Sequence, residues 1–244
     1  MEEAMSEFPS GLVGPIAPPE ALVEELCGPW VMGNRRGVST SRERGLIVEG
    51  LLNEDEVALV HKALVETPWV RANQNGFVAG DKETTGSWRA TWYSAALAGA
   101  LWSRVRLAIG EDTQEFEEFP GVLWRAASIN NACRLIRYES GGVVWPHYDA
   151  PYVAGESLRS FLSVVLYLTD TVEDGATQFL KDPHGDPEFK DWDRVGRADE
   201  VLSVVTARGG DALIFPHRIL HEAPQTLEDK LILRTDVMFE VVES

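Results

Sequence analysis

Short apolar runs alternate with turn-forming residues along the C-terminal half of the sequence. From residue 133 onward, stretches rich in β-branched and aromatic residues are separated by clusters of Gly, Pro and Asp, the pattern of successive β-strands. The near-continuous apolar run 161–168 indicates a buried strand. We expect strands at 134–138, 144–149, 161–168, 177–180, 201–206, 212–215 and 230–241.

The preceding stretch has the apolar spacing of two amphipathic helices. After a short strand at 46–48, Asn53 and Glu56 form the sequence signature of a capping box, and a helix of about 12 residues follows. A second helix is expected from Ser94 to Gly110, with one apolar stripe. The glycine-rich segment 69–92 between them is expected to be loop, either covering a site or simply connecting the helices.

Residues 1–44 are expected to form a partly ordered, Pro-rich extension. Its prolines prevent a long regular element, although a short helix fits 19–27. The arginine-rich run 34–44 is interpreted as a solvated linker, with partner contact as the alternative. Residues 45–244 then form one domain. Two helices followed by seven or eight short strands predict an α+β fold, a β-sandwich or barrel of jelly-roll type with the helices packed on one sheet.

The last strand has one polar and one apolar face, because successive side chains alternate. One face carries Lys230, Ile232, Arg234, Asp236, Met238 and Glu240, and the other is apolar throughout. If helices cover the apolar face, Lys230 and Arg234 point into the barrel, where unpaired cations are costly. A bound anion would explain them; the alternatives are pairing with Asp236 or Glu240, or reaching solvent at the barrel mouth.

Composition narrows the classes of function. With 44% hydrophobic residues in 244, the chain can bury one sizeable core. The net charge of −17 disfavours binding to nucleic acid or anionic membranes. We find no secretory signal and no apolar run of membrane-spanning length, and expect a cytoplasmic protein. Cys27 and Cys133 lack metal or redox spacing and are expected to be reduced thiols.

The candidate chemistry centres on the sequence Trp-Pro-His-Tyr-Asp, which ends at Asp149. On an extended strand, His147 and Asp149 project from one face. With the distant His221, they match the two-histidine, one-carboxylate facial triad, which leaves three positions on Fe(II) open. A rival pair, His184 and Asp186, is bracketed by prolines and contains a glycine, so we interpret it as a turn rather than a metal site.

These motifs together resemble the Fe(II)- and 2-oxoglutarate-dependent dioxygenases, and most closely their prolyl 4-hydroxylase-like branch. The resemblance spans residues 45–241 and includes Arg-Tyr-Glu-Ser-Gly-Gly before the first metal motif, Gly-Asp-Ala-Leu-Ile-Phe before the distal histidine, and Lys-Leu-Ile-Leu-Arg-Thr-Asp-Val at the end. It implies a double-stranded β-helix in which His147, Asp149 and His221 hold Fe(II), a 2-oxoglutarate cosubstrate and O2 as the oxidant.

The same resemblance implies roles for residues around the iron. We prefer His221 over the nearby His217 as third ligand, because the family pattern places the ligand in a His-Glu-x-Pro context. Lys230 is favoured as the anchor of the distal 2-oxoglutarate carboxylate, although Arg234 lies on the same strand face. Tyr138 matches a tyrosine that packs against the cosubstrate. Alternation then makes Arg134, on the face of Tyr138, a candidate to hold substrate or cosubstrate.

The expected reaction is hydroxylation of an unactivated C–H bond, coupled to decarboxylation of 2-oxoglutarate to succinate. The substrate is expected to be a prolyl or other side chain of a protein or peptide, with a small molecule as the alternative. A carboxylate ligand at Asp149 leaves no position for chloride, which disfavours a ligand-deficient halogenase. A nucleobase demethylase is disfavoured by the acidic charge. A non-catalytic jelly-roll binding or sensing module is the remaining alternative.

Overall fold

The computed structural model describes residues 16–42, 44–73, 84–110, 112–171, 175–182 and 194–242. The rival pair His184 and Asp186 lies outside these residues. Within them, no helix has the length and apolar character needed to cross a bilayer. The helices are α1 (Glu20–Leu26), α2 (Glu54–Leu64) and α3 (Ala95–Ile109).

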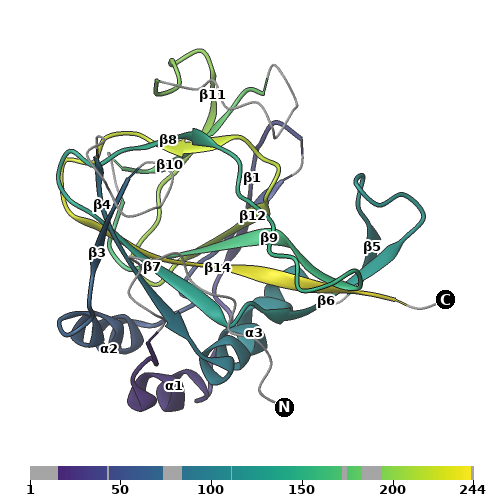
Figure 1. The fold of residues 1–244 in the computed structure, drawn as a ribbon, viewed down its shortest axis with the longest axis horizontal. Coiled ribbons are helices and arrows are strands. Elements are labelled where there is room, and N and C mark those ends of the chain that lie inside the picture. The colour runs from purple at the N-terminus through teal and green to yellow at the C-terminus, as the bar shows by residue number, and fades with distance from the viewer. Residues whose placement is uncertain are drawn as a thin grey trace.

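A large, mainly antiparallel sheet forms the centre of the molecule (Figure 1). Its strand order is β1-β2-β12-β9-β14-β7-β4-β3, with β6 paired to β14 and β5 paired to β6. The strands are β1 (Arg35–Val38), β2 (Gly45–Val48), β3 (Val70–Asn73), β4 (Thr84–Tyr93), β5 (Thr113–Glu115), β6 (Leu123–Ile129), β7 (Ala132–Tyr138), β9 (Leu158–Tyr167), β12 (Ala212–Pro216) and β14 (Lys230–Val241).

A smaller sheet faces the large one on the side away from the helices (Figure 1). Its order is β11-β10-β13-β8, formed by β8 (Val144–His147), β10 (Thr177–Leu180), β11 (Val201–Val205) and β13 (His221–Ala223). Apolar side chains from both sheets meet between them, among them Tyr167, Phe179 and Phe215, which are fully buried. The two facing sheets form a double-stranded β-helix, which confirms the predicted fold class.

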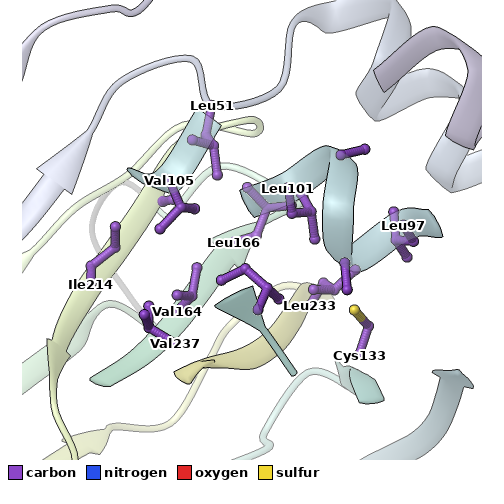
Figure 2. Packing of buried hydrophobic residues seen from close by; sticks show 14 of the residues in the cluster. Leu51, Leu97, Leu101, Val105, Cys133, Val164, Leu166, Ile214, Leu233 and Val237 are labelled. Atoms are coloured by element: carbon purple, nitrogen blue, oxygen red, sulfur yellow. The ribbon is translucent and has the colours of Figure 1, made fainter. Parts of the chain in front are cut away.

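The helices cover the outer face of the large sheet. The stripe of Leu97, Leu101 and Val105 on α3 packs onto side chains of β9 and β14, including Val164 and Leu233 (Figure 2). Each such side chain contributes about 1.5–3 kcal/mol when removed from water. The apolar face of the last strand therefore lies under the helices, as predicted, and its other face looks into the barrel.

Local signals place the helix ends where the sequence predicts them. The Asn53 side chain accepts from the Glu56 amide at 2.9 Å, and the Glu56 carboxylate accepts from the Asn53 amide at 2.8 Å. Ser94 caps α3 by accepting from the Leu97 amide at 3.2 Å, and Gly110 ends the helix with φ of 82°. The capping box and both helix starts are confirmed.

Two segments are more regular than expected. The predicted loop 69–92 contains strand β3 and most of β4, and β4 pairs with β7 from Ser87 to Tyr93. The glycines of this segment hid the alternating strand pattern of its last residues, in which Trp92 is a buried position, 1% exposed. Residues 35–38, inside the expected linker, form β1 and pair with β2. Only Val38 of β1 is buried, so an edge strand of this kind has a polar sequence like that of a linker.

Candidate metal and dicarboxylate site

Three potential metal ligands converge at the open edge of the smaller sheet. His147 is the last residue of β8 and His221 the first of β13, and the two are register partners. Asp149 lies past the end of β8, where its amide donates to the His217 carbonyl at 3.0 Å. The ligand atoms of His147, Asp149 and His221 all lie within 4.8 Å of one another. The residues chosen from the sequence are therefore brought together, although Asp149 lies beyond the strand expected to carry it.

Both imidazoles present the same nitrogen to this cluster. His147 Nδ1 bonds to the Trp145 carbonyl at 2.8 Å, and His221 Nδ1 bonds to the Ile219 carbonyl at 2.9 Å. Because a carbonyl only accepts, each Nδ1 carries the proton and each Nε2 keeps its lone pair. The Nε2 atoms lie 3.7 and 3.8 Å from the Asp149 oxygens. In metal-binding histidines, the ring nitrogen that does not bind the metal usually donates its proton to a backbone carbonyl or a carboxylate, as it does here.

Protonation in the cluster also suits a divalent cation. Burial lowers the pKa of His147 and lowers the pKa of His221 to about 3. Burial alone would raise the pKa of Asp149, but Arg234 and the neighbouring histidines together hold it well below the ordinary range. At neutral pH the imidazoles are neutral and the carboxylate is ionised, which are the forms that coordinate metals.

Asp149 is oriented by a chain of directional hydrogen bonds. Ser163 Oγ donates to Asp149 Oδ2 and accepts from His217 Nδ1 at 2.8 Å. His217 Nε2 accepts from Ser160 Oγ at 2.8 Å, and Ser160 Oγ accepts from the Tyr152 amide at 2.7 Å. Both nitrogens of His217 are thus used by serines. The imidazole of His217, the competing third ligand, is therefore linked to Asp149 through Ser163 and is not part of the metal cluster.

A cavity of about 80 Å³ adjoins the three ligands inside the barrel. Three cationic side chains line it, Lys230, Arg234 and Arg89, together with Tyr138. Lys230 is 5% exposed, donates to the Gly175 carbonyl, and places Nζ 5.7 Å from the centre of the Tyr138 ring. Cations this buried favour an anionic occupant.

Arg234 lines the cavity and also contacts the metal cluster. Its Nη2 is 3.1 Å from Asp149 Oδ1 and 3.3 Å from Asp236 Oδ1. Arg134 pairs with Asp236 at 3.7 Å and is not among the residues that line the cavity. Pairing with Asp236 was one alternative explanation for the cations of the last strand. It holds for Arg234, although Arg234 also lines the cavity.

Sequence reasoning missed Arg89. It lies on β4, in the segment expected to be loop, and lines the cavity from the same sheet as Lys230, with β7 between their two strands. Among the described residues, no carboxylate pairs with it. The signal was present in the alternation of polar and aromatic residues at 87–92, which is a strand pattern.

Comparisons with known proteins agree with this architecture. A prolyl-4-hydroxylase of Pseudomonas putida superposes with a TM-score of 0.50 at 16% identity, covering 89% of this chain and 97% of that chain. HygX from Streptomyces hygroscopicus, solved with nickel and 2-oxoglutarate bound, gives a TM-score of 0.49 at 15% identity, with 80% and 82% covered. At 16% identity, the likeness to the Pseudomonas putida enzyme bears on the fold alone.

No curated protein sequence matches this chain at a significant level. The family model described as Phytanoyl-CoA dioxygenase (PhyH) matches residues 43–230. This confirms the dioxygenase resemblance, whereas the prolyl 4-hydroxylase-like branch stays a prediction. The chain belongs to the phytanoyl-CoA dioxygenase family and is an oxygenase of the iron- and 2-oxoglutarate-dependent superfamily.

Proposed function

We propose that this enzyme hydroxylates an unactivated C–H bond, with Fe(II) held by His147, Asp149 and His221 and 2-oxoglutarate held in the adjoining cavity. The observation that carries the proposal is the shared wall: all three ligands line the cavity that also contains Lys230 and Arg234. A dicarboxylate bound there has one end beside the metal and the other beside a buried cation. The donor set of two imidazoles and one carboxylate fits Fe(II) and leaves open positions.

Bound iron would supply the oxidation chemistry, in which O2 converts 2-oxoglutarate to succinate and CO2 while a C–H bond becomes C–OH. The protein contributes position and charge. Lys230 orients the distal carboxylate, and Tyr138 forms the apolar wall beside it. Arg234 neutralises Asp149 before metal binds and then faces the keto-acid end of the cosubstrate. Arg89 adds a further positive charge to the cavity.

The first test measures binding and turnover separately. We expect Mn(II) binding by calorimetry and, with Fe(II) and 2-oxoglutarate, release of succinate from the purified protein. His147→Ala should lower Mn(II) affinity more than 100-fold and abolish succinate release, because it removes one of three ligands. His61→Ala, which changes an exposed histidine on α2, is the matched control and should change neither.

Two results would contradict the proposal. Unchanged Mn(II) affinity in His147→Ala would show that the metal binds elsewhere. Failure of the wild-type protein to bind iron after anaerobic reconstitution would favour the non-catalytic jelly-roll module. The hydroxylated group is a prolyl or other side chain of a peptide, or a small molecule, and a second cavity bears on that choice.

A further inference from the structure

A second and larger cavity, of about 430 Å³, lies on the other side of Asp149. Asp149 lines both cavities, whereas His147 and His221 line only the smaller one, so a molecule in the larger cavity contacts the metal cluster at Asp149. His217 and Ser160, which help to orient Asp149, also line it. The volume falls in the range of small-molecule sites, about 300–1,000 Å³.

Aromatic side chains form one wall of this cavity. Phe116 and Phe161 stack with ring centres 3.6 Å apart, and Phe119 meets Phe161 edge-on at 5.9 Å. Phe161 is on β9, whereas Phe116 and Phe119 come from the segment that connects β5 and β6. This segment projects beside the barrel in Figure 1. The wall therefore offers an apolar surface suited to hydrocarbon.

One cation in this cavity lacks a carboxylate partner among the residues that the structure describes. Arg218 pairs with Glu118 at 3.0 Å, and Arg42 pairs with Glu117 at 3.4 Å. Arg159 instead lies over the Phe119 ring, with Cζ 4.4 Å from its centre, and its buried Nε has no hydrogen-bond acceptor in the described part of the chain.

The surplus charge at Arg159 is notable in a chain whose net charge is −17. Acidic side chains are abundant, yet none of the described ones neutralises this guanidinium. A planar guanidinium in partly apolar surroundings pairs well with a planar carboxylate, through two parallel hydrogen bonds. The cavity thus combines an apolar wall, one available cation and contact with a metal ligand.

We propose that the primary substrate is a small molecule carrying a free carboxylate and an apolar or aromatic body. Its carboxylate pairs with Arg159, its body lies along Phe116, Phe119 and Phe161, and the C–H bond to be hydroxylated lies at the end of the cavity that Asp149 borders, beside the metal site. This inference rests on the proposed function, and it favours a metabolite over a prolyl side chain, because a prolyl residue within a peptide has no carboxylate to match Arg159.

The test uses 4-phenylbutyrate as the probe and its neutral amide as the matched control. Each is titrated by calorimetry into protein saturated with Mn(II) and 2-oxoglutarate, so that the smaller cavity is filled. We expect the carboxylate to bind at least tenfold more tightly than the amide. Arg159→Gln should remove that preference, Arg159→Lys should keep part of it, and Arg125→Gln, an exposed arginine paired with Glu240, should keep all of it.

Equal binding of the two probes to the wild-type protein, or binding of neither at millimolar concentration, would overturn the inference. A preference that survives in a folded Arg159→Gln variant, checked by its unfolding temperature, would also overturn it. Binding of 2-oxoglutarate is measured first in the same preparation. Loss of that binding refutes the proposed function and this inference together, whereas normal 2-oxoglutarate binding without a carboxylate preference refutes the inference alone.

Discussion

His147 lies directly opposite His221 in the antiparallel pair of β8 and β13, with ring centres 4.2 Å apart. Two ligands far apart in sequence are therefore spaced by the register of one strand pair. A shift of one residue would turn either imidazole to the opposite face of the sheet. The metal site thus depends on backbone pairing for its histidines and on side-chain contacts for Asp149.

The hydrogen bonds that link His217 to Asp149 through Ser163 are expected to control metal affinity, although neither Ser163 nor His217 is a metal ligand. Ser163→Ala removes the donor to Asp149 Oδ2 and leaves His217 Nδ1 without its acceptor. Loss of such a partner of a metal ligand lowers affinity about 10–100-fold, so we expect Mn(II) binding to weaken by that factor in calorimetry.

The control for this effect is Ser103→Ala, which removes a hydroxyl that bonds to the Ala100 carbonyl within α3. It should leave Mn(II) affinity unchanged. If Ser163→Ala binds Mn(II) as tightly as the wild-type protein does, Arg234 and the backbone hold Asp149 adequately. The hydrogen bonds through Ser163 then have no positioning role.

Lys230 and Arg234 are expected to have separable effects on 2-oxoglutarate. A hydrogen bond to a charged group contributes about 1.5–3 kcal/mol, and each 1.4 kcal/mol is about tenfold. Lys230→Gln should therefore raise the KM for 2-oxoglutarate about 10–100-fold while Mn(II) affinity stays the same. Arg137→Gln, an exposed arginine paired with Asp229, is the control.

If Arg234→Gln raises the KM more than Lys230→Gln does, Arg234 is the main anchor. Arg234 also contacts Asp149, so its replacement removes a cation that competes with metal for the carboxylate. We therefore expect Arg234→Gln to leave Mn(II) affinity equal or slightly higher, which distinguishes it from loss of a ligand.

The elements that the sequence predicted well are those specified by local pattern. The alternation of polar and apolar residues along β14 predicted that Lys230 and Arg234 face the inside of the barrel and that the apolar residues lie under α3. It succeeded because the helices bury only one face of the strand. Asn53 and Ser94 marked the helix starts through hydrogen bonds within a single turn. His147 and His221 lie on short strands whose neighbours are turn residues.

The features that escaped prediction depend on pairing partners far away in the chain. The alternation at 87–92 indicates a strand, but Arg89 reaches the cavity because that strand pairs with β7, and the choice of pairing partner has no local signal. The strand β1 has one buried side chain and gains its order from pairing with β2. The aromatic cavity likewise needs Phe116 and Phe161 from separate elements, and neither residue alone indicated a site.

The two cysteines are expected to differ sharply in reactivity. Cys133 is fully buried, and burial raises the pKa of its thiol to about 12, whereas Cys27 is exposed. Because the thiolate is the reactive form, a disulfide reagent at pH 8 should modify Cys27 rapidly in the native protein. It should modify Cys133 only in denaturant. Equal rates for both thiols without denaturant would show that the core around Cys133 opens readily.

The buried pair of Arg104 and Glu56 joins the helices to one another, and breaking it should be costly. Their side chains are each 2% exposed and form two hydrogen bonds, at 2.5 and 2.8 Å, while Arg104 also donates to the Leu26 and Leu51 carbonyls. Arg104→Met leaves Glu56 buried without its cation, which typically costs about 3–5 kcal/mol. We expect a loss of that size in urea unfolding. Replacing both residues, Glu56→Leu with Arg104→Met, should restore part of the stability, because no unpaired charge remains in the core. The matched reference is Glu56→Gln with Arg104→Met, which keeps an acceptor for the Asn53 amide. If neither double variant is more stable than Arg104→Met, the carbonyl contacts of Arg104, rather than the ion pair, hold α1 to the rest of the fold.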